Sequence, residues 1–266
     1  MKTTLLISTY NRPDALRLCL LSAFRQTLLP DEILVGDDGS TEETAHLIEE
    51  MKQRSPVPLI HVWQEDKGFR LAAVRNKCIA RASGDYIVQV DGDLILQPHF
   101  IEDHLAFAAP GYYVKGGRVN ITDRLTKALC ASGELRNLTF FTPGLMRRVN
   151  AVRCLPLARY LSERRRTAPG LGCNLSYWRK DALAVNGYDE FFEGWGGEDW
   201  DFAVRLLHSG LKKRSLKFAG IVFHLWHNDL YMHNKAKNFK YYYEVVDNAQ
   251  RVRCEHGVEQ YLQEAQ

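Results

Sequence analysis

The sequence predicts an α/β protein with a mainly parallel central sheet and helices on both of its faces. In the first hundred residues, short and continuously apolar segments alternate with longer segments of helical pattern. Continuously apolar strands are typical of parallel sheets, which are buried on both faces. Three of the apolar segments also run directly into polar clusters, as expected where strands of such a sheet end at a ligand site.

Four strands are expected in this region, because each is a short apolar run bounded by polar residues. They span Thr4 to Ser8, Glu32 to Gly36, Leu59 to Trp63 and Tyr86 to Val90. The first helix should begin near Pro13, since proline is favoured in a first helical turn, and continue through Phe24. Ser40 and Glu43 have the spacing of a capping box, which predicts a second helix. Residues 69 to 82, rich in Ala and Arg, form the third.

The second half of the chain is less regular. The pattern loosens from Arg124 to Pro169, and order returns at Gly172 to Ser176. A glycine-rich turn at Gly194 to Gly197 precedes a predicted helix from Glu198 to Ser209. The last strand is expected at Gly220 to Phe223, and the segment that follows is aromatic and polar.

Composition limits the classes of protein that fit. With 266 residues, 45% of them hydrophobic, the chain can bury a substantial core. A net charge of +3 does not indicate nucleic-acid binding, so no nucleic-acid partner is expected. Six scattered cysteines without a CxxC pair indicate reduced thiols, and no secretory signal or apolar run of spanning length is visible. These features predict a cytoplasmic protein that is soluble or lies on a membrane surface.

Asp91-Gly92-Asp93 is the first candidate for chemistry. Two carboxylates separated by one residue at a strand end can both face a hard cation such as Mg²⁺ or Mn²⁺, whose other positions are filled by water and substrate phosphates. The alternative is a plain hairpin turn, for which Asp-Gly is a strong signal. The apolar strand before the motif and the polar clusters at the other strand ends favour the metal site.

Two further segments have both a structural and a functional interpretation. Asp38 either caps the following helix or accepts a hydrogen bond from a nucleobase. Acidic side chains at residues 198–201 would be stabilised by the positive end of a helix dipole, which is enough to explain their presence in a first helical turn. Three glycines around Trp195, however, are entropically unfavourable unless the loop moves over a ligand or approaches it closely. In that case Asp199 can act as a general base on a hydroxyl.

Histidines and arginines later in the chain supply two more candidates. His224 and His227 are either ordinary histidines or the source of an imidazole for a metal already held by carboxylates. A zinc site with Cys254 and His256 is a weaker alternative, because no close Cys pair exists. The arginine-rich stretch of residues 147–166 is either a solvated basic surface or a docking site for an anionic acceptor or lipid surface.

Taken together, these motifs resemble two known families. The first half is similar to the family-2 glycosyltransferases of the GT-A fold, a Rossmann-like and mostly parallel sheet with helices on both faces. Its matching segments are Ile7 to Arg12, Val35 to Ser40, Gly68 to Asn76 and Val90 to Asp93. The later part resembles the galactosyltransferase-type catalytic segment of chondroitin-polymerase-like bacterial enzymes. It matches at Gly172 to Ser176, Asn186 to Glu190 and Gly194 to Asp199.

The resemblance, which covers residues 3–121 and 170–228, implies a division of the chain. Residues 1–121 would bind the nucleotide-sugar donor. Residues 122–228 would bind the acceptor and complete the catalytic site within the same domain. Residues 229–266 would form a C-terminal extension of helices and loops.

The resemblance also implies roles for individual residues. The nucleotide would be bound by Thr9, Asp38, Arg70 and Asp91. The metal, Mn²⁺ or Mg²⁺, would be held by Asp93 and Asp91, with His224 or else His227 completing the site. Asp199 would be the catalytic base, with Glu198 beside it and Trp195, Gly196 and Gly197 forming the acceptor side and lid. Trp200 departs from the many relatives that carry an acidic or aliphatic residue there, which leaves the details of the acceptor site open.

The implied reaction is an inverting transfer of a sugar from a nucleotide diphosphate sugar, UDP-hexose or UDP-N-acetylhexosamine, to a hydroxyl of an acceptor. The acceptor would be a saccharide or a lipid-linked saccharide in cell-surface polysaccharide or lipopolysaccharide synthesis. The protein would act in the cytoplasm, and peripheral contact with the inner membrane face is left open. The alternative from another class is a nucleotide-sugar-binding protein without turnover.

Overall fold

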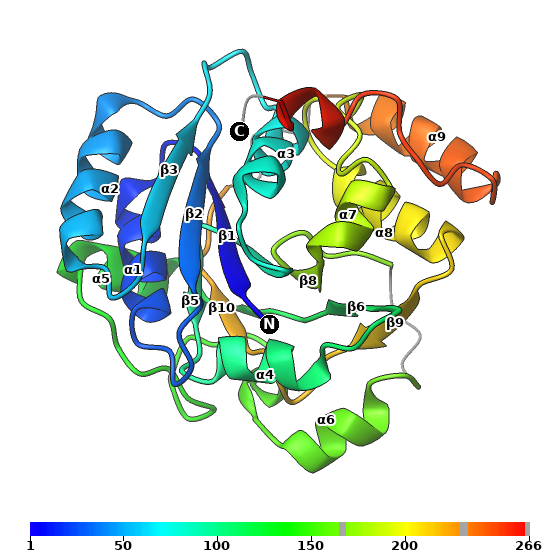
Figure 1. Ribbon diagram of the computed structural model, residues 1–266. Helices are drawn as coiled ribbons and strands as arrows, with labels where there is room; N and C mark the ends of the chain where they lie inside the picture. Colours follow the sequence, from blue (N-terminus) through cyan, green and yellow to red (C-terminus); the bar gives the residue numbers. More distant parts are fainter. Residues whose placement is uncertain (165–168, 229–233, 264–266) are drawn as a thin grey trace.

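The computed structural model describes residues 1–164, 169–228 and 234–263 and contains two sheets (Figure 1). The larger sheet has seven strands in the order β3-β2-β1-β4-β8-β6-β9. These are β1 (Thr3–Thr9), β2 (Glu32–Asp37), β3 (Leu59–Trp63), β4 (Tyr86–Asp91), β6 (Tyr112–Lys115), β8 (Asn174–Trp178) and β9 (Lys212–Ser215). The smaller sheet, in the order β5-β10-β7, consists of β5 (Leu94–Leu96), β7 (Val119–Asn120) and β10 (Val222–His224).

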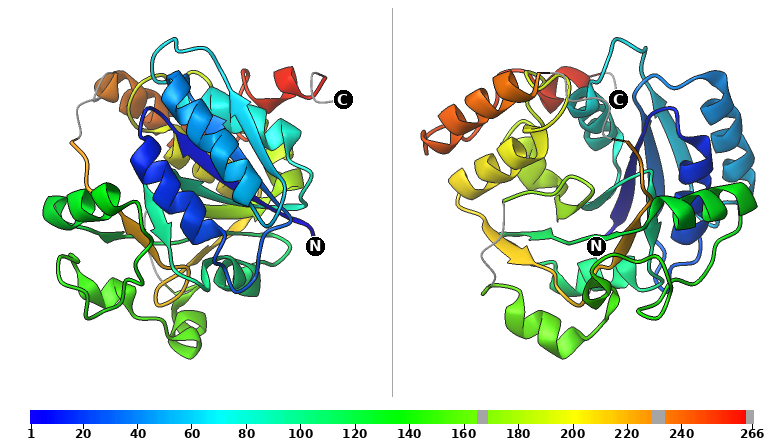
Figure 2. Two further views of the ribbon diagram at one scale, coloured as in Figure 1. Left: turned by 90° about the vertical axis from the view of Figure 1, so that its left-hand side faces the viewer. Right: turned by 180° about the vertical axis from the view of Figure 1, so that it is seen from behind.

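Helices surround the larger sheet. They are α1 (Pro13–Ala23), α2 (Glu42–Arg54), α3 (Leu71–Arg81), α4 (Phe100–Phe107), α5 (Asp123–Ser132), α6 (Leu155–Leu161), α7 (Arg179–Ala184), α8 (Glu198–His208) and α9 (Lys235–Val246). Two short 3₁₀ turns are η1 (Arg148–Ala151) and η2 (Val258–Tyr261). Figure 1 shows α1 and α2 on one side of the strands and α3, α7 and α8 on the other, an arrangement that both views of Figure 2 support.

Both faces of the larger sheet are buried because successive side chains of a strand point to opposite faces. Leu5 and Ile7 of β1 pack in the core that contains α1 and α2, whereas Leu6 packs in the core that contains α3, α7 and α8. Strands β1 to β4 are mutually parallel. The predicted fold class, a mainly parallel sheet with helices on both faces, is therefore confirmed.

Strand β8 is the exception, because it runs antiparallel to both of its neighbours, β4 and β6. Its position brings the second half of the chain into the middle of the sheet, next to the strand that ends at Asp91. Sequence patterns did not indicate β5, β6, β7 or β9, which are only two to four residues long and too short to show a period.

The predicted capping box at the second helix is wrong. The N-cap of α2 is Thr41, and no side chain caps this helix. Ser40 Oγ instead accepts the backbone N–H of Asn11 at 2.8 Å, while Asn11 Oδ1 accepts the N–H of Thr41 at 2.9 Å. A tertiary contact between neighbouring strand ends thus replaces the local bond that the spacing suggested.

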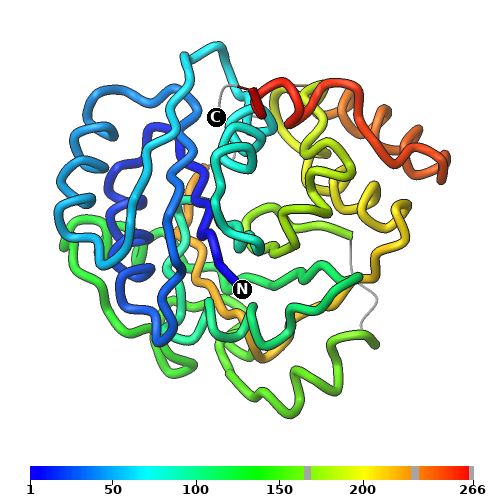
Figure 3. Tube along the Cα trace, viewed as in Figure 1, coloured from blue at the N-terminus to red at the C-terminus, as the bar shows by residue number. Residues whose placement is uncertain are grey.

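The C-terminal segment returns to the main body of the protein. Figure 3, in the view of Figure 1, shows the red segment that follows α9 lying beside α3. Val258 of η2 is fully buried in the same core cluster as Cys78 and Ile79 of α3. Among the described helices, none has the length and apolar character needed to cross a membrane.

His104 of α4 lies at the centre of a buried polar network that supports β8. Its Nε2 is 2.9 Å from Asn174 Oδ1, and its Nδ1 is 2.7 Å from Ser176 Oγ. The amide nitrogen of Asn174 donates to the carbonyls of Gly117 and Gly220, so its oxygen must face the histidine. The neutral ring therefore donates from Nε2 and accepts at Nδ1, and burial lowers the pKa of His104 to about 4.

This network predicts a dependence of stability on pH. Because the folded-state pKa of His104 lies below the unfolded value of 6.5, its contribution is complete above pH 6.5 and is lost as the pH falls toward 4. The loss should reach on the order of 3 kcal/mol once the folded protein is protonated as well, below about pH 4. Urea unfolding of wild type and His104→Gln at pH 7 and pH 5 measures it. The difference in unfolding free energy between the two proteins should shrink at pH 5; a constant difference would contradict this assignment.

Candidate active site

The three polar clusters predicted from the sequence lie together at one edge of the larger sheet. In the register of the parallel strands, Ser8 pairs with Asp91, and Thr9 pairs with Asp37. Each strand ends within a residue or two of these pairs, so Asp38 and Asp93 follow at neighbouring positions. Ligands bind at this edge in open α/β sheets, because the loops that leave the strands form a crevice there.

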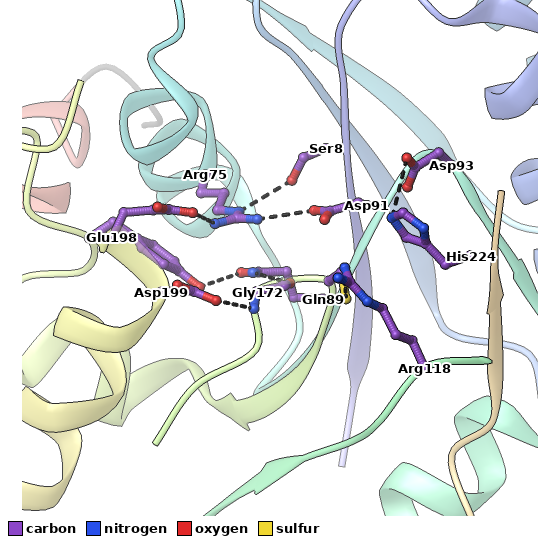
Figure 4. A network of polar contacts seen from close by, with 12 residues as sticks. Ser8, Arg75, Gln89, Asp91, Asp93, Arg118, Gly172, Glu198, Asp199 and His224 are labelled. Atoms are coloured by element: carbon purple, nitrogen blue, oxygen red, sulfur yellow. Dashed lines mark hydrogen bonds and ion pairs between the residues drawn. The ribbon is translucent and has the colours of Figure 1, made fainter. Parts of the chain in front are cut away.

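Asp93, His224 and His227 form a cluster in which one ligand atom of each residue lies within 4.8 Å of the others. Asp93 Oδ2 is 3.6 Å from His224 Nε2 and 3.4 Å from His227 Nε2. Strand pairing brings them together, because His224 of β10 pairs with Leu94, the residue after Asp93. Figure 4 shows the Asp93 carboxylate facing the ring of His224.

Two features of the cluster fit a bound metal ion. Asp93 Oδ1 is buried and has no hydrogen-bond partner among the described residues. Burial, with the positive charge of Arg118 close by, lowers the pKa of His224 to about 4 and keeps the imidazole neutral, as a metal ligand must be. Asp93 Oδ2 accepts from Arg12 Nη1 at 2.8 Å, so a guanidinium now neutralises the carboxylate.

A buried guanidinium links the two halves of the site. Arg75 of α3 is 1% exposed and donates to Asp91 Oδ1 at 3.0 Å and to Glu198 Oε1 at 3.1 Å. Its Nε lies 3.3 Å from Ser8 Oγ. Figure 4 shows Arg75 between these groups, with the strand-end carboxylate on one side and the start of α8 on the other. A buried charge held by three partners fixes their relative positions, because losing any partner would leave it unpaired.

The start of α8 places Asp199 against the end of the segment that leads into β8. Asp199 Oδ2 accepts the backbone N–H of Gly172 at 2.6 Å, and Gly172 O in turn accepts from Gln89 Nε2 at 2.8 Å. A side chain at position 172 would lie 2.9 Å from the Arg75 guanidinium and 3.1 Å from the Asp199 side chain, so this close approach requires glycine. Gly197, the N-cap of α8, has a φ of 99° that also favours glycine.

Both acids at this helix start are less acidic than usual. Burial and the adjacent charge of Asp199 raise the pKa of Glu198 to about 7, despite the opposing effect of Arg75. Burial also raises the pKa of Asp199, while its bond from Gly172 and the charge of Arg75 oppose that shift. A carboxylate with a raised pKa is a better proton acceptor, which suits a general base.

Asp38 and Arg70 form the other end of the site. Asp38 is 3% exposed; its Oδ1 accepts from Gln64 Nε2 at 2.5 Å, and its Oδ2 accepts the backbone N–H of Arg70 at 2.8 Å. Arg70 Nε and Gln64 Oε1 are buried and have no hydrogen-bond partner among the described residues. Unpaired buried polar atoms beside Asp38 fit a site whose ligand completes the hydrogen bonding.

The glycine-rich loop is held in place from both sides. Gly194 N–H donates to Phe69 O at 2.9 Å, and Asn238 Nδ2 of α9 donates to Glu193 O at 3.1 Å and to Trp195 O at 3.4 Å. The Trp195 ring lies 5.0 Å from Lys235 Nζ and 6.4 Å from the Phe239 ring centre. The loop therefore connects the segment before α3 to α9.

Sequence comparison assigns both halves of this site to known families. Residues 4–151 match the model for glycosyl transferase family 2, and residues 157–228 match the model described as the N-terminal domain of galactosyltransferase. The first match alone covers more than half of the chain. The protein belongs to glycosyltransferase family 2.

Curated relatives include enzymes of polysaccharide synthesis. Chondroitin synthase of Escherichia coli is 26% identical over 241 residues, which cover 81% of this chain and 34% of the relative. Validoxylamine A glucosyltransferase of Streptomyces hygroscopicus subsp. limoneus is 30% identical over 225 residues, or 78% of this chain and 48% of the relative. The chain thus spans between a third and a half of the length of these two relatives.

Solved structures confirm that this chain has the GT-A fold. S. aureus TarS superposes on 98% of this chain and 41% of its own, with a TM-score of 0.64 at 15% identity. GalNAc-T7, solved with UDP, GalNAc and Mn²⁺, covers 93% of this chain and 48% of its own, with a TM-score of 0.66 at 16% identity.

The structure separates the predicted metal ligands into two groups. It brings Asp93, His224 and His227 together, while Asp91 is bonded to Arg75 and lies outside that cluster. The weaker zinc alternative is not supported within the described residues, since Cys254 and His256 do not belong to any metal-ligating group there. The individual roles of the predicted site residues stay predictions.

Sequence reasoning missed Arg75 and Arg12 as site residues, although both fall in the family motifs. Arg75 had a detectable signal, because it is a charged residue on a predicted helix whose neighbours Val74 and Cys78 are apolar and buried. Part of the predicted arginine stretch, Arg165 and Arg166, lies outside the described residues.

His224→Ala should weaken Mn²⁺ binding more than His227→Ala does. The side chain of His224 is 13% exposed and belongs to a paired strand, whereas that of His227 is 37% exposed and follows the strand, so His224 is more firmly positioned. Calorimetric titration of Mn²⁺ into both variants measures the difference. The reverse order of affinities would make His227 the principal ligand.

Donor binding should change the environment of Trp195. The glycines of this loop allow a rearrangement when the donor and metal bind, and Asn238 limits it in the free protein. We expect Trp195 emission to shift on adding UDP-sugar with Mn²⁺, and Asn238→Ala to reach that signal at lower donor concentration. Trp195→Phe identifies the contribution of this ring. An emission change that persists in Trp195→Phe would locate the response elsewhere.

Proposed function

We propose that this chain is a metal-dependent, inverting glycosyltransferase that moves a hexose or N-acetylhexosamine from a UDP-sugar to a hydroxyl of a saccharide acceptor. One observation supports this most strongly: Arg75 joins Asp91, at the strand end beside the metal-ligating cluster, to Glu198, next to Asp199. A donor site and a base are thereby held at a fixed separation, as a single displacement requires.

The donor would occupy the edge of the sheet from Asp38 to Asp93. Thr9, Asp38, Arg70 and Asp91 would bind the nucleotide, and the unpaired Arg70 Nε and Gln64 Oε1 are groups that it could satisfy. UDP is favoured because TarS and GalNAc-T7 have been solved with it. Asp93 with His224 and His227 would hold the metal ion.

The ligand set favours Mn²⁺ over Mg²⁺. One carboxylate and two imidazoles suit a first-row transition ion, whereas Mg²⁺ prefers an all-oxygen environment. When bound, the ion would neutralise the charge that develops on the leaving diphosphate. Arg12, which pairs with Asp93 in this structure, would lose that partner when Asp93 holds the ion and would then be available to an anionic ligand.

Asp199 would accept the proton of the acceptor hydroxyl as that oxygen attacks the anomeric carbon. The Gly172 N–H holds its carboxylate in place, and burial raises its pKa, so that it is a competent base when ionised. Attack on the face opposite the leaving diphosphate inverts the anomeric configuration, and an α-linked donor gives a β-glycoside. Glu198 and Trp195, with Gly196 and Gly197, would line the acceptor side.

The acceptor would be a growing cell-surface saccharide, free or lipid-linked, and the enzyme would act in the cytoplasm at or near the inner membrane face. In this scheme residues 1–121 serve the donor, residues 122–228 serve the acceptor and catalysis, and residues 229–266 extend the domain. The polysaccharide synthases among its relatives support this acceptor class.

A panel of nucleotide sugars tests the proposal. Thermal-shift measurements with and without Mn²⁺ identify the donor, since a ligand that binds the folded state raises the melting temperature. Release of the nucleotide from that donor, with NMR of the transferred sugar, then establishes turnover and inversion. Donor binding without any release of nucleotide diphosphate, even with a range of saccharide acceptors, would favour the alternative of a binding protein without turnover.

A further inference from the structure

Residues 136–164 form a surface that is both apolar and basic; we call it the 136–164 surface. Six of the fourteen exposed large hydrophobic side chains of the described residues fall here, which is far more than this short segment would hold by chance. They are Phe140, Phe141, Met146, Val149, Leu157 and Tyr160. Phe141 is 82% exposed and Tyr160 is 60% exposed, so these rings face solvent. Such a concentration of apolar side chains marks an interaction site.

The charge of the 136–164 surface is mostly positive, and its one acid, Glu163, pairs with Arg214 at 3.0 Å. No Asp or Glu occurs between Glu134 and Glu163, a segment that contains five arginines. Arg153 points inward and pairs with the buried Asp103 at 2.7 Å. The other four are exposed, and none takes part in an ion pair recorded between described residues: Arg136, Arg147, Arg148 and Arg159. The exposed charge is therefore available to an anionic partner.

The fold holds this surface in place even though it has little regular secondary structure. Leu138 and Leu145 are buried in the core next to β7 and β10, which leaves the intervening Phe140 and Phe141 outside. Met146 N–H donates to Asn120 O at 2.9 Å, which fixes the exposed Met146 beside β7. In Figure 1, α6 and the segment before it lie along the lower edge of the molecule, away from α2 and α9.

Backbone hydrogen bonds also connect the 136–164 surface to β10, the strand that carries His224 of the metal-ligating cluster. Ile121 N–H donates to His224 O at 2.9 Å, and Ile121 forms a bridge with Leu145. Only one short strand, β7, therefore separates the ligand strand β10 from the 136–164 surface.

We propose that the 136–164 surface binds the surface of an anionic phospholipid bilayer. Exposed aromatic and aliphatic side chains enter the interface between headgroups and acyl chains, while arginines beside them contact lipid phosphates and bring the protein to the negatively charged leaflet. Phe140 and Phe141 between Arg136 and Arg147 combine both contributions in one loop. A partner protein is disfavoured by the charge, because its matching surface would need acids spread along the whole segment.

This inference extends the proposed function but does not depend on turnover, since vesicle binding can be measured without a substrate. Bound in this way, the enzyme would have its metal-ligating strand one strand away from the lipid surface. A lipid-linked acceptor would then reach the site without leaving the bilayer.

Vesicle flotation tests the proposal with the full chain. We expect binding to vesicles of phosphatidylcholine with phosphatidylglycerol and little binding to phosphatidylcholine alone. Phe141→Ser with Met146→Ser should weaken binding by at least about tenfold, because the apolar contribution is lost. Arg147→Gln with Arg148→Gln should weaken it by about tenfold or more, and raised salt should reduce binding of the wild type further.

Matched controls separate this surface from general effects. Tyr243→Ser removes an exposed aromatic ring from α9, and Arg54→Gln with Arg81→Gln makes the same change in net charge elsewhere. Both controls should float like the wild type. The proposal would be overturned if the controls lost vesicle binding as strongly as the surface variants. It would also be overturned if the wild-type protein did not bind anionic vesicles. Sedimentation that shows a dimer, abolished by Phe141→Ser with Met146→Ser, would make the surface a subunit interface instead.

Nucleotide release from the donor, measured in solution, distinguishes the two hypotheses. The surface variants should keep the wild-type rate of donor hydrolysis. Vesicle binding without any release of nucleotide, even with a range of saccharide acceptors, would contradict the proposed function and leave the membrane surface supported. Nucleotide release without vesicle binding would do the reverse.

Discussion

Asp199→Asn should lower turnover by roughly 10²–10⁴-fold, the usual contribution of a positioned general base. The amide oxygen of Asn can still accept the N–H of Gly172, so the start of α8 should keep its geometry. Donor affinity should therefore change little, since the lost group acts on the acceptor hydroxyl. Steady-state kinetics with calorimetry of UDP binding separate the two effects.

The pH profile adds a second measurement of the same group. Because burial raises the pKa of Asp199, wild-type turnover should rise with pH through a pKa above the ordinary range of aspartate, as the carboxylate becomes ionised. Asp199→Asn should lose this rise. Glu193→Gln, which changes an exposed acid before the same helix, is the control and should behave like the wild type. If Asp199→Asn keeps near-normal turnover, Asp199 is only an acid at the start of a helix.

Asp93→Ala should abolish metal-dependent binding of the nucleotide. The substitution removes the one carboxylate of the cluster. Removing a residue that only supports a metal ligand typically lowers metal affinity 10- to 100-fold. Losing a ligand itself should cost more, so affinity for Mn²⁺ should fall by more than about 100-fold. Calorimetry of UDP binding with and without Mn²⁺ measures this. The weak binding that remains should no longer respond to the metal.

Two controls make this result specific. Asp247→Ala removes an exposed carboxylate after α9 and should leave the metal effect intact. The melting temperature of Asp93→Ala without metal reports whether the variant is folded, because Arg12 also loses its partner. A folded Asp93→Ala protein whose UDP binding still depends on Mn²⁺ would remove Asp93 from the metal site.

The sequence alone predicted those candidate residues whose position follows from their immediate neighbours in the chain. A buried strand needs a continuous apolar run, and a ligand at its end needs polar residues immediately after that run, so Asp91 and Asp93 were detectable from their neighbours alone. The same holds for Asp199, which follows a glycine-rich turn and begins a helix. Alternation of strand and helix through the first hundred residues was enough to predict the parallel sheet.

The local pattern misled where a tertiary contact was stronger. Ser40 has the spacing of a helix cap, yet its hydroxyl accepts a hydrogen bond from Asn11, 29 residues away. Similarly, the sequence indicated Asn174 only as part of a motif. In the structure its amide oxygen bonds to the buried His104, and its amide nitrogen donates to two backbone carbonyls. A short polar side chain can satisfy either partner, and only the packed structure decides which one is within reach.

What the sequence determined by itself is therefore the four parallel strands, the edge at which they end and the acids at that edge. Only the tertiary structure decided that His224 faces Asp93. It also decided that Arg75 joins Asp91 to Glu198, which lies 123 residues after Arg75 in the sequence. It also decided which side chains of residues 136–164 are exposed. The physical reason is that the periodicity of apolar residues in a segment indicates which of its residues are buried. The pairing of distant charged groups depends instead on strand order and register, which no short segment encodes.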